Sequence, residues 1–216
     1  MLVLAIDTSS AAVSAAVVSV DGGVVAQRVT IDARAHGELL APSVAACLDD
    51  ARIEPRDLAA IVAGVGPGPF TGLRVGLVTA AAMADVLGIP AYGVCSLDAL
   101  AAAVDADSLL VATDARRREV YWARYAGGVR VEGPSVDRPT DLSTVDVQAM
   151  TGAGARLYAD VLGLPLLDID YPDLVSLVRL AASKIRSRAP GEALTPLYLR
   201  RPDAVVPGTA KAVTPR

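Results

Sequence analysis

The chain has 216 residues, of which 53% are hydrophobic and 20% are charged, and its formal net charge is −4. This length fits one domain or two small ones, and the composition is that of a folded globular protein with a mainly aliphatic core, because aromatic residues make up 4%. One histidine and two cysteines exclude a Cys/His-type zinc site and a disulfide framework, and the acidic balance excludes a strongly basic nucleic-acid-binding protein.

No targeting or membrane-spanning segment is expected. The apolar start over residues 1–6 is too short for a signal sequence and is interrupted by Asp7. The longest charge-free run, residues 58–73, contains Pro67 and Pro69, which a plain membrane-spanning helix would not. We therefore expect a cytoplasmic protein with reduced thiols and no membrane partner.

The first hundred residues predict three antiparallel strands followed by alternating helices and strands. The three strands are expected over 2–6, 12–20 and 24–31, with a hairpin turn at the Asp-Gly-Gly of 21–23. The apolar periodicity then predicts a helix over 37–51, a strand over 57–65, a Gly/Pro loop over 66–69 and a long helix over 71–87. A strand over 91–94 and a helix over 97–103, with Ser96 as its N-cap, complete this half.

The second half repeats this order in a weaker form. Strands are expected over 109–113, 119–125 and 129–132, helices over 155–162 and 174–188, and loop-like chain over 134–147. The duplicated order predicts an α/β protein of the actin/sugar-kinase/Hsp70-like superfold, with two lobes that each hold a mixed sheet flanked by helices. We place the first lobe at 1–103 and a smaller, degenerate second lobe at 104–200. A flexible tail is expected over 201–216, with fraying of the last seventeen residues.

Charge differs between the two halves of the chain. Residues 1–100 carry ten acids and five bases, which is a net charge of −5, whereas residues 101–216 carry fourteen acids and fifteen bases, which is +1. Either the imbalance is a chance property of solvated surfaces, or the second half is the part that contacts RNA.

Several motifs resemble those of the TsaB (YeaZ-type) family, and the resemblance covers nearly the whole chain. Residues 4–9 (Leu-Ala-Ile-Asp-Thr-Ser) resemble the first phosphate motif of the superfold. Residues 66–76 (Gly-Pro-Gly-Pro-Phe-Thr-Gly-Leu-Arg-Val-Gly) resemble the family hallmark, and residues 114–116, 119–121 and 196–200 match further family motifs.

The resemblance implies a non-catalytic bacterial subunit of the machinery that forms N6-threonylcarbamoyladenosine at position 37 of tRNA. Such a subunit binds and activates the catalytic paralogue TsaD, and the small ATPase TsaE joins the complex. The resemblance also implies that tRNA is reached indirectly through the complex, that the chain forms a homodimer when alone, and that ATP or ADP is a candidate ligand at the junction with TsaD, with no cofactor intrinsic to this chain.

The sequence departs from related patterns at three places. TsaD carries a His-x-x-x-His metal pair, but here His36 is followed four residues later by Leu40, so the metal and the catalysis are expected in another chain. The second half lacks the Asp-x-Gly-Gly of a second phosphate loop, and Pro69 stands where the family more often has serine. We therefore predict no catalytic residue and no metal ligand here.

Five residues are candidates for a nucleotide or phosphate site. The Gly/Pro loop leads into a helix N-terminus, which favours an anion, and a strand-end Asp-Thr-Ser suits a metal–phosphate. The alternative for the loop is a tight strand-to-helix turn, and for the strand end an Asx or Ser/Thr turn. The candidates are Asp7, Thr8, Ser9, Gly66 and Gly68.

The helix over 71–87 is apolar on all sides, which predicts burial on more than one side. Small residues recur along it every four positions and would let a second helix approach closely. That second helix is either a neighbour in the same chain or a partner protein, and we favour a docking face for TsaD made with the 37–51 helix. We expect Ala80→Arg to abolish the complex without unfolding the chain. The predicted interface is Leu40, Val44, Gly72, Arg74, Val75, Gly76, Thr79, Ala80, Met83 and Ala84.

Other conspicuous residues favour structural roles. His36 is interpreted as a helix-start residue, Cys47 and Cys95 as core, and the aromatic residues of 121–125 as packing rather than base stacking. The arginines of 116–118 predict a solvated turn, with an electrostatic contact to a partner or RNA as the alternative. The second hypothesis for the whole chain is a stand-alone nucleotide-dependent kinase or ATPase of the same superfold, with Asp7 or Asp114 as its base.

Overall fold

The N-terminal strands build the sheet of the first lobe. The computed structural model describes residues 1–200, in which β1 (Leu2–Asp7) pairs antiparallel with β2 (Ala12–Ser19), and β2 with β3 (Gly23–Ile31). On the other side of β1, β4 (Leu58–Gly64) and β5 (Ala91–Val94) pair in parallel, giving the order β3-β2-β1-β4-β5. β1 and β2 are buried on both faces, which explains their nearly continuous apolar sequences.

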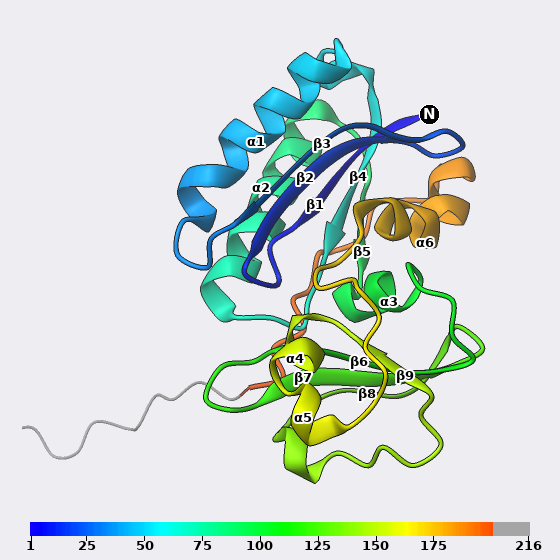
Figure 1. Cartoon of the computed structure of the whole chain (residues 1–216). Coiled ribbons are helices and arrows are strands. Elements are labelled where there is room, and N and C mark those ends of the chain that lie inside the picture. The colour runs from blue at the N-terminus through cyan, green and yellow to red at the C-terminus, as the bar shows by residue number, and fades with distance from the viewer. Residues whose placement is uncertain (201–216) are drawn as a thin grey trace, which may run out of the picture.

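Helices cover both faces of this sheet (Figure 1). α1 (His36–Ala51) and α2 (Phe70–Leu87) lie side by side on one face and share an aliphatic core with it. α3 (Ser96–Ala101) and α6 (Leu174–Arg186) cover the opposite face. By length and apolarity α2 would suffice to span a membrane, although a third of it is buried inside the protein.

The second lobe is a smaller sheet with its own covering helices. Its order is β8-β7-β6-β9, formed by β6 (Ser108–Asp114), β7 (Val120–Ala126), β8 (Val129–Asp137) and β9 (Ala149–Thr151). α3 packs against one face, and α4 (Ala153–Leu157) and α5 (Ala159–Leu162) against the other. Two 3-10 turns, η1 (Pro55–Asp57) and η2 (Pro139–Asp141), complete the elements of the described chain.

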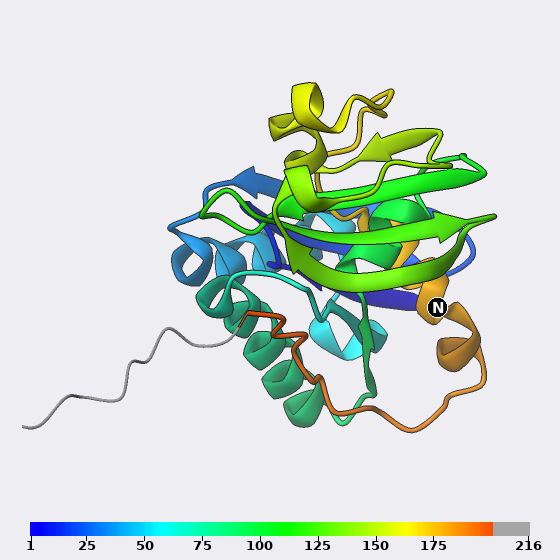
Figure 2. The same ribbon diagram turned by 90° about the horizontal axis from the view of Figure 1, so that it is seen from below.

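After α6 the chain crosses the molecule and covers the edge of β5 (Figure 2). The segment 187–200 runs from the end of α6 to the N-terminal end of α2. Along its path, the Glu192 N–H donates to the Ala91 oxygen at 2.9 Å and the Leu197 N–H donates to the Val65 oxygen at 2.9 Å. The exposed edge of the parallel strands is thereby paired rather than left open.

The two mixed sheets flanked by helices confirm the predicted fold class, and several boundaries differ from the prediction. β8 continues to Asp137, β9 was not predicted, and 155–162 is divided into two short helices. α6 was grouped with the second lobe, yet its apolar side packs on the first sheet. Cys95 rather than Ser96 caps α3. The predicted tail, 201–216, lies outside the described residues.

Gly64 at the end of β4 has no space for a side chain. A Cβ there would overlap the Asp7 Oδ2 atom and lie 2.7 Å from the Ser96 Oγ atom. Gly64→Ala should therefore lower the free energy of unfolding by about 1–3 kcal/mol, the usual cost of overpacking. Urea unfolding measures this. Gly37→Ala on α1 is the control, because its Cβ would meet nothing within 4 Å. Equal stability of the two variants would contradict the packing described here.

Candidate functional site

The sequence-predicted phosphate residues converge where β1 ends against α2 and α3. Three of them lie together with a fourth polar residue, Ser96. We call these four residues the junction cluster: Asp7, Thr8, Ser9 and Ser96. Asp7 is buried, and its carboxylate accepts hydrogen bonds from the Ser9 N–H at 2.9 Å, the Ser9 hydroxyl at 2.8 Å and the Ser96 hydroxyl at 2.6 Å. Burial raises the pKa of Asp7, while the hydrogen bonds from Ser96 and Ser9 and the charge of His36 oppose that rise.

Thr8 ties the first strand to α2. Its hydroxyl donates to the Gly72 carbonyl at 2.8 Å and accepts from the Gly76 N–H at 3.1 Å, two groups that a regular helix pairs with each other. A Cβ at Gly76 would overlap the Thr8 Oγ1 atom, and one at Gly72 would lie 2.9 Å from the Thr8 oxygen. The glycines of α2 therefore allow Thr8 of the same chain to approach the helix closely.

The Gly/Pro loop is packed against the strand end in the same way. A Cβ at Gly68 would overlap the backbone oxygen of Ser9. Gly66 is also held by a hydrogen bond within the chain, because the Ser96 N–H donates to the Gly66 carbonyl oxygen at 2.8 Å. The structure thus brings the five phosphate candidates together, and the polar groups of four of them are used inside the protein: Asp7 and Ser9 bond to each other, Thr8 bonds to the α2 backbone, and Gly66 bonds to Ser96. It supports the turn interpretation of Asp7, Thr8 and Ser9.

A cavity of about 570 Å³ lies between the lobes, next to the junction cluster. The first turn of α2, including Phe70 and Thr71, borders it from the first lobe, and Asp114, Arg116 and Tyr171 border it from the second. Thr113, also in its wall, holds the single buried side-chain oxygen of residues 1–200 that has no hydrogen-bond partner. This cavity is the site where a polar ligand between the lobes would fit.

The late Pro-Leu-Tyr-Leu-Arg motif closes the same region. The centres of the Tyr198 and Phe70 rings lie 5.0 Å apart. The Arg74 guanidinium lies over the same Phe70 ring, 4.1 Å from its centre. Arg200 forms an ion pair with Glu119 of the second lobe. The motifs that are far apart in sequence therefore meet where α2 begins.

The predicted docking stripe is wrong in part. Six of its residues are buried by the chain itself and cannot form a surface: Leu40, Val44, Gly72, Gly76, Ala80 and Ala84. The other four lie at or near the surface: Arg74 is exposed, and Val75, Thr79 and Met83 are partly buried. Ala80 is fully buried, so Ala80→Arg would unfold the protein rather than test an interface.

The surface left by α1 and α2 nevertheless contains a run of apolar positions among exposed charged residues such as Glu38 and Asp85. On α2 the exposed positions recur every four residues at Arg74, Val78, Ala82 and Val86, and Val78 is 65% exposed. On α1 the exposed positions include Gly37, Ala41 and Ala45, at the same spacing. We call these seven residues the α1–α2 face. The small-residue stripe of this face lies on α1, and the sequence signal for it is the Gly-x-x-x-Ala-x-x-x-Ala of 37–45.

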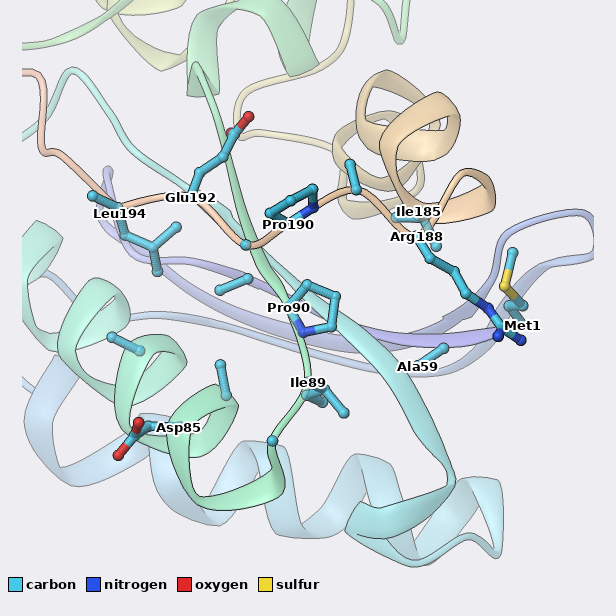
Figure 3. Close-up of a pocket in the computed structure, with 17 residues that line it drawn as sticks. Met1, Ala59, Asp85, Ile89, Pro90, Ile185, Arg188, Pro190, Glu192 and Leu194 are labelled. Atoms are coloured by element: carbon cyan, nitrogen blue, oxygen red, sulfur yellow. The ribbon is translucent and has the colours of Figure 1, made fainter.

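A further cavity, of about 850 Å³, lies away from the junction cluster (Figure 3). It separates the C-terminal half of α2 from the segment 185–194, and Ile89, Pro90, Ile185 and Leu194 supply much of its wall. Asp85, Arg188 and Glu192 stand at its margins. No serine, threonine, cysteine or histidine of the described residues lines it, and most of its lining residues are apolar.

The remaining candidates hold structural positions, as predicted. His36 begins α1, is buried, and has its Nε2 atom 2.8 Å from the Ser10 oxygen. Both cysteines are buried, and burial raises the pKa of Cys95 to about 11. Tyr121, Trp122 and Tyr125 are buried as well. Within residues 1–200, no three His, Cys, Asp or Glu side chains are grouped to hold a metal ion.

Ser96 is the member of the junction cluster that sequence reasoning assigned to another role. It begins α3 directly after β5, and the carboxyl ends of the parallel strands β1, β4 and β5 meet at one edge of the sheet. Polar residues that follow such strands converge in space. The position of Ser96 directly after a parallel strand would therefore have predicted that it lies close to Asp7.

Comparison with known proteins places the chain among tRNA-modification proteins. Residues 8–185 match the family model of TsaD, the tRNA N6-adenosine threonylcarbamoyltransferase. The chain is 52% identical over 206 residues to an uncharacterized protein of Mycobacterium leprae, and covers 56% of that protein's length. It is 39% identical over 127 residues to the tRNA threonylcarbamoyladenosine biosynthesis protein TsaB of Bacillus subtilis, with 58% of this chain and 55% of that protein covered.

A solved structure of a similar protein shares the fold of this chain. An uncharacterized Pseudomonas aeruginosa protein with similarity to peptidase YeaZ superposes with a TM-score of 0.78 at 29% identity, covering 92% of this chain and 99% of the other. The likeness extends over both lobes and supports the superfold assignment.

The raised pKa of Asp7 gives a testable pH dependence. Because the folded state binds the Asp7 proton more tightly than the unfolded chain, this group lowers the free energy of unfolding as the pH rises from the unfolded to the folded pKa. Asp7→Asn keeps an acceptor for Ser9 and offers an N–H to the Ser96 hydroxyl. We expect this variant to lose that pH dependence and to equal or exceed wild-type stability at about pH 7 in urea unfolding.

Asp7→Ala is the matched control, since it leaves the Ser9 and Ser96 donors unpaired and should cost about 1–3 kcal/mol. Lower stability of Asp7→Asn at neutral pH would show that the hydrogen bonds of the carboxylate outweigh the cost of burying it.

Proposed function

We propose that this chain, which belongs to the TsaD family and is a TsaB (YeaZ-type) member of it, is the non-catalytic subunit that binds and activates TsaD in tRNA threonylcarbamoyladenosine formation. Similarity to TsaB supports the role in this pathway. The observation that carries the binding role is the α1–α2 face, in which exposed aliphatic and small side chains predominate.

The composition of the α1–α2 face suits a protein partner. Gly37, Ala41 and Ala45 of α1 have small or no side chains, so a partner helix can approach the α1 backbone closely. On α2, Val78 and Val86 are 65% and 84% exposed, although both side chains are aliphatic and they lie about two turns apart on the same side of the helix. Burying such a face against a second protein removes apolar area from water and stabilises the complex.

Two polar groups that could act in catalysis are held in structural contacts within residues 1–200, which is consistent with the proposed non-catalytic role. The chain has a single histidine, and its ring is held by Ser10 at the start of α1. The carboxylate of Asp7 is enclosed and bonded by serines. A general base must reach its substrate, and Asp7 does not reach an open cavity.

The same enclosure argues against the stand-alone kinase. Gly68, one of the phosphate candidates, packs directly on the backbone oxygen of Ser9, another of them. Asp114, the second candidate base, is exposed and accepts from the Arg116 N–H at 2.8 Å. ATP turnover by the pure chain separates the two functions: robust, sugar-stimulated hydrolysis would favour the kinase.

The other partners remain predictions. The predicted partners are ATP or ADP at the TsaD junction, TsaE in the complex, and tRNA reached through the complex. A homodimer of the isolated chain and a cytoplasmic location are predictions as well. The cavity between the lobes, with the unpaired Thr113 hydroxyl, is where we propose that a nucleotide would enter.

Val78→Arg tests the docking face. A charge in the middle of an apolar interface must be desolvated without a partner, so we expect at least a tenfold loss of affinity for TsaD, measured by calorimetry. Since Val78 is already 65% exposed, the thermal stability of the isolated chain should not change.

Val129→Arg is the matched control, because Val129 is 66% exposed but lies on β8 of the second lobe. If both variants bind TsaD as the wild type does, the α1–α2 face is not the docking surface. If Val129→Arg alone is defective, the interface lies on the second sheet.

A further inference from the structure

The turn between β6 and β7 has an unusual backbone. Arg116, Arg117 and Arg118 follow one another with φ of 60°, 54° and 63°, all in the left-handed region. The turn is closed by the Glu119 N–H donating to the Arg116 oxygen at 3.0 Å and the Ala115 N–H donating to the Glu119 oxygen at 3.0 Å. Three consecutive non-glycine residues in this region are rare, since the left-handed conformation strains every L-residue with a side chain.

The residue type at these positions is not explained by the backbone. Glycine adopts this conformation without strain, and asparagine and aspartate tolerate it better than arginine. What arginine adds is a guanidinium group at each step of the turn. Strain of this kind, kept in place by the surrounding structure, is common at ligand-binding sites.

The turn directs its arginines to two cavities. Arg116 borders the cavity between the lobes, whereas Arg117 and Arg118 line a separate pocket of about 480 Å³ on the outer side of the second lobe. The other polar residues that line this pocket are Arg138, Thr140 and Tyr158. Arg138 follows β8, and Tyr158 lies between α4 and α5. We call this pocket the arginine pocket.

Two of its arginines have unused charge. Arg118 and Arg138 are exposed, and no acidic side chain within residues 1–200 forms an ion pair with either. Other arginines of the described residues are paired, as in Arg156 with Asp170 at 2.7 Å and Arg186 with Asp21 at 2.8 Å, whereas Arg34 and Arg52 share the unpaired state but line no common pocket with Arg118. Unpaired guanidinium groups around one pocket, in the half of the chain that is net positive, create a local site for an anion despite the acidic total charge.

We propose that the arginine pocket binds a phosphodiester group of the RNA, so that this subunit touches the tRNA directly rather than only through its partner. The inference rests on the proposed function, which supplies the RNA. A planar guanidinium matches two phosphate oxygens at once, and the partly buried Tyr158 ring offers a face for an adjoining sugar or base. The contact recognises the backbone and carries no sequence preference.

The test uses the full chain assembled with TsaD and a tRNA transcript, with affinity measured by fluorescence anisotropy at several salt concentrations. The double variant Arg118→Asn/Arg138→Gln removes both charges, and asparagine fits the backbone of residue 118. Two lost phosphate contacts should weaken binding about tenfold and reduce the slope of log affinity against log salt by about 1.5. Arg118→Lys/Arg138→Lys, which keeps the charges, should retain most of the slope.

Arg56→Gln is the control for general charge loss, because Arg56 is an exposed arginine on η1 of the first lobe. Calorimetry with TsaD tests the proposed function separately from the RNA contact. Unchanged tRNA affinity and salt slope in the double variant, with the complex intact, would overturn the RNA contact and leave the proposed function standing. Loss of TsaD binding in the double variant would make the pocket a protein interface and also overturn it. A wild-type chain that does not bind TsaD would refute the proposed function itself.

Discussion

The arrangement of the first lobe depends on the Thr8 hydroxyl, which bridges a carbonyl and an N–H of α2. This contact requires a backbone with no Cβ at Gly72 and Gly76, since a side chain at either position would meet Thr8. A buried hydroxyl that lost its partners would cost about 1–3 kcal/mol. The contact therefore fixes both the distance of α2 from the sheet and the rotation of the helix about its axis, and that rotation decides which side chains of α2 remain outside.

The same close packing changes the chemistry of the strand end. In an open cleft, an aspartate followed by threonine and serine would face a ligand. Here the Asp7 carboxylate is used by Ser9 and Ser96, and Gly68 lies on the backbone of Ser9. The motif has become a structural joint between β1, α2 and α3. The apolar positions on the outer side of α1 and α2 are then the chemically distinctive feature of the first lobe's surface.

Sequence patterns predicted the elements held by local periodicity and missed those held by distant contacts. The Asp-Gly-Gly turn and the apolar runs placed β1 to β4 and α2 within a few residues. Glycines at every fourth position of α2 correctly indicated a close approach, but not whether the approaching group was Thr8 or a second protein. β9 has three residues and is held by its pairing with β6, so it leaves no periodic signal. The sequence Arg-Arg-Arg carries no sign of a left-handed backbone.

The geometry of the two lobes makes a combined surface physically reasonable. Phe70 and Val75 of α2 border the same interlobe cavity as Arg116, whose turn also supplies Arg118 to the arginine pocket. The C-terminal segment holds this arrangement, because Tyr198 packs on Phe70 and Arg200 pairs with Glu119 at the end of the arginine turn. A protein seated on α2 and a polyanion seated on the arginine turn would thus contact parts that one segment fixes relative to each other. In the proposed function, such a fixed arrangement would let this subunit influence how an enzyme and its RNA are oriented, because positioning alone contributes to rate.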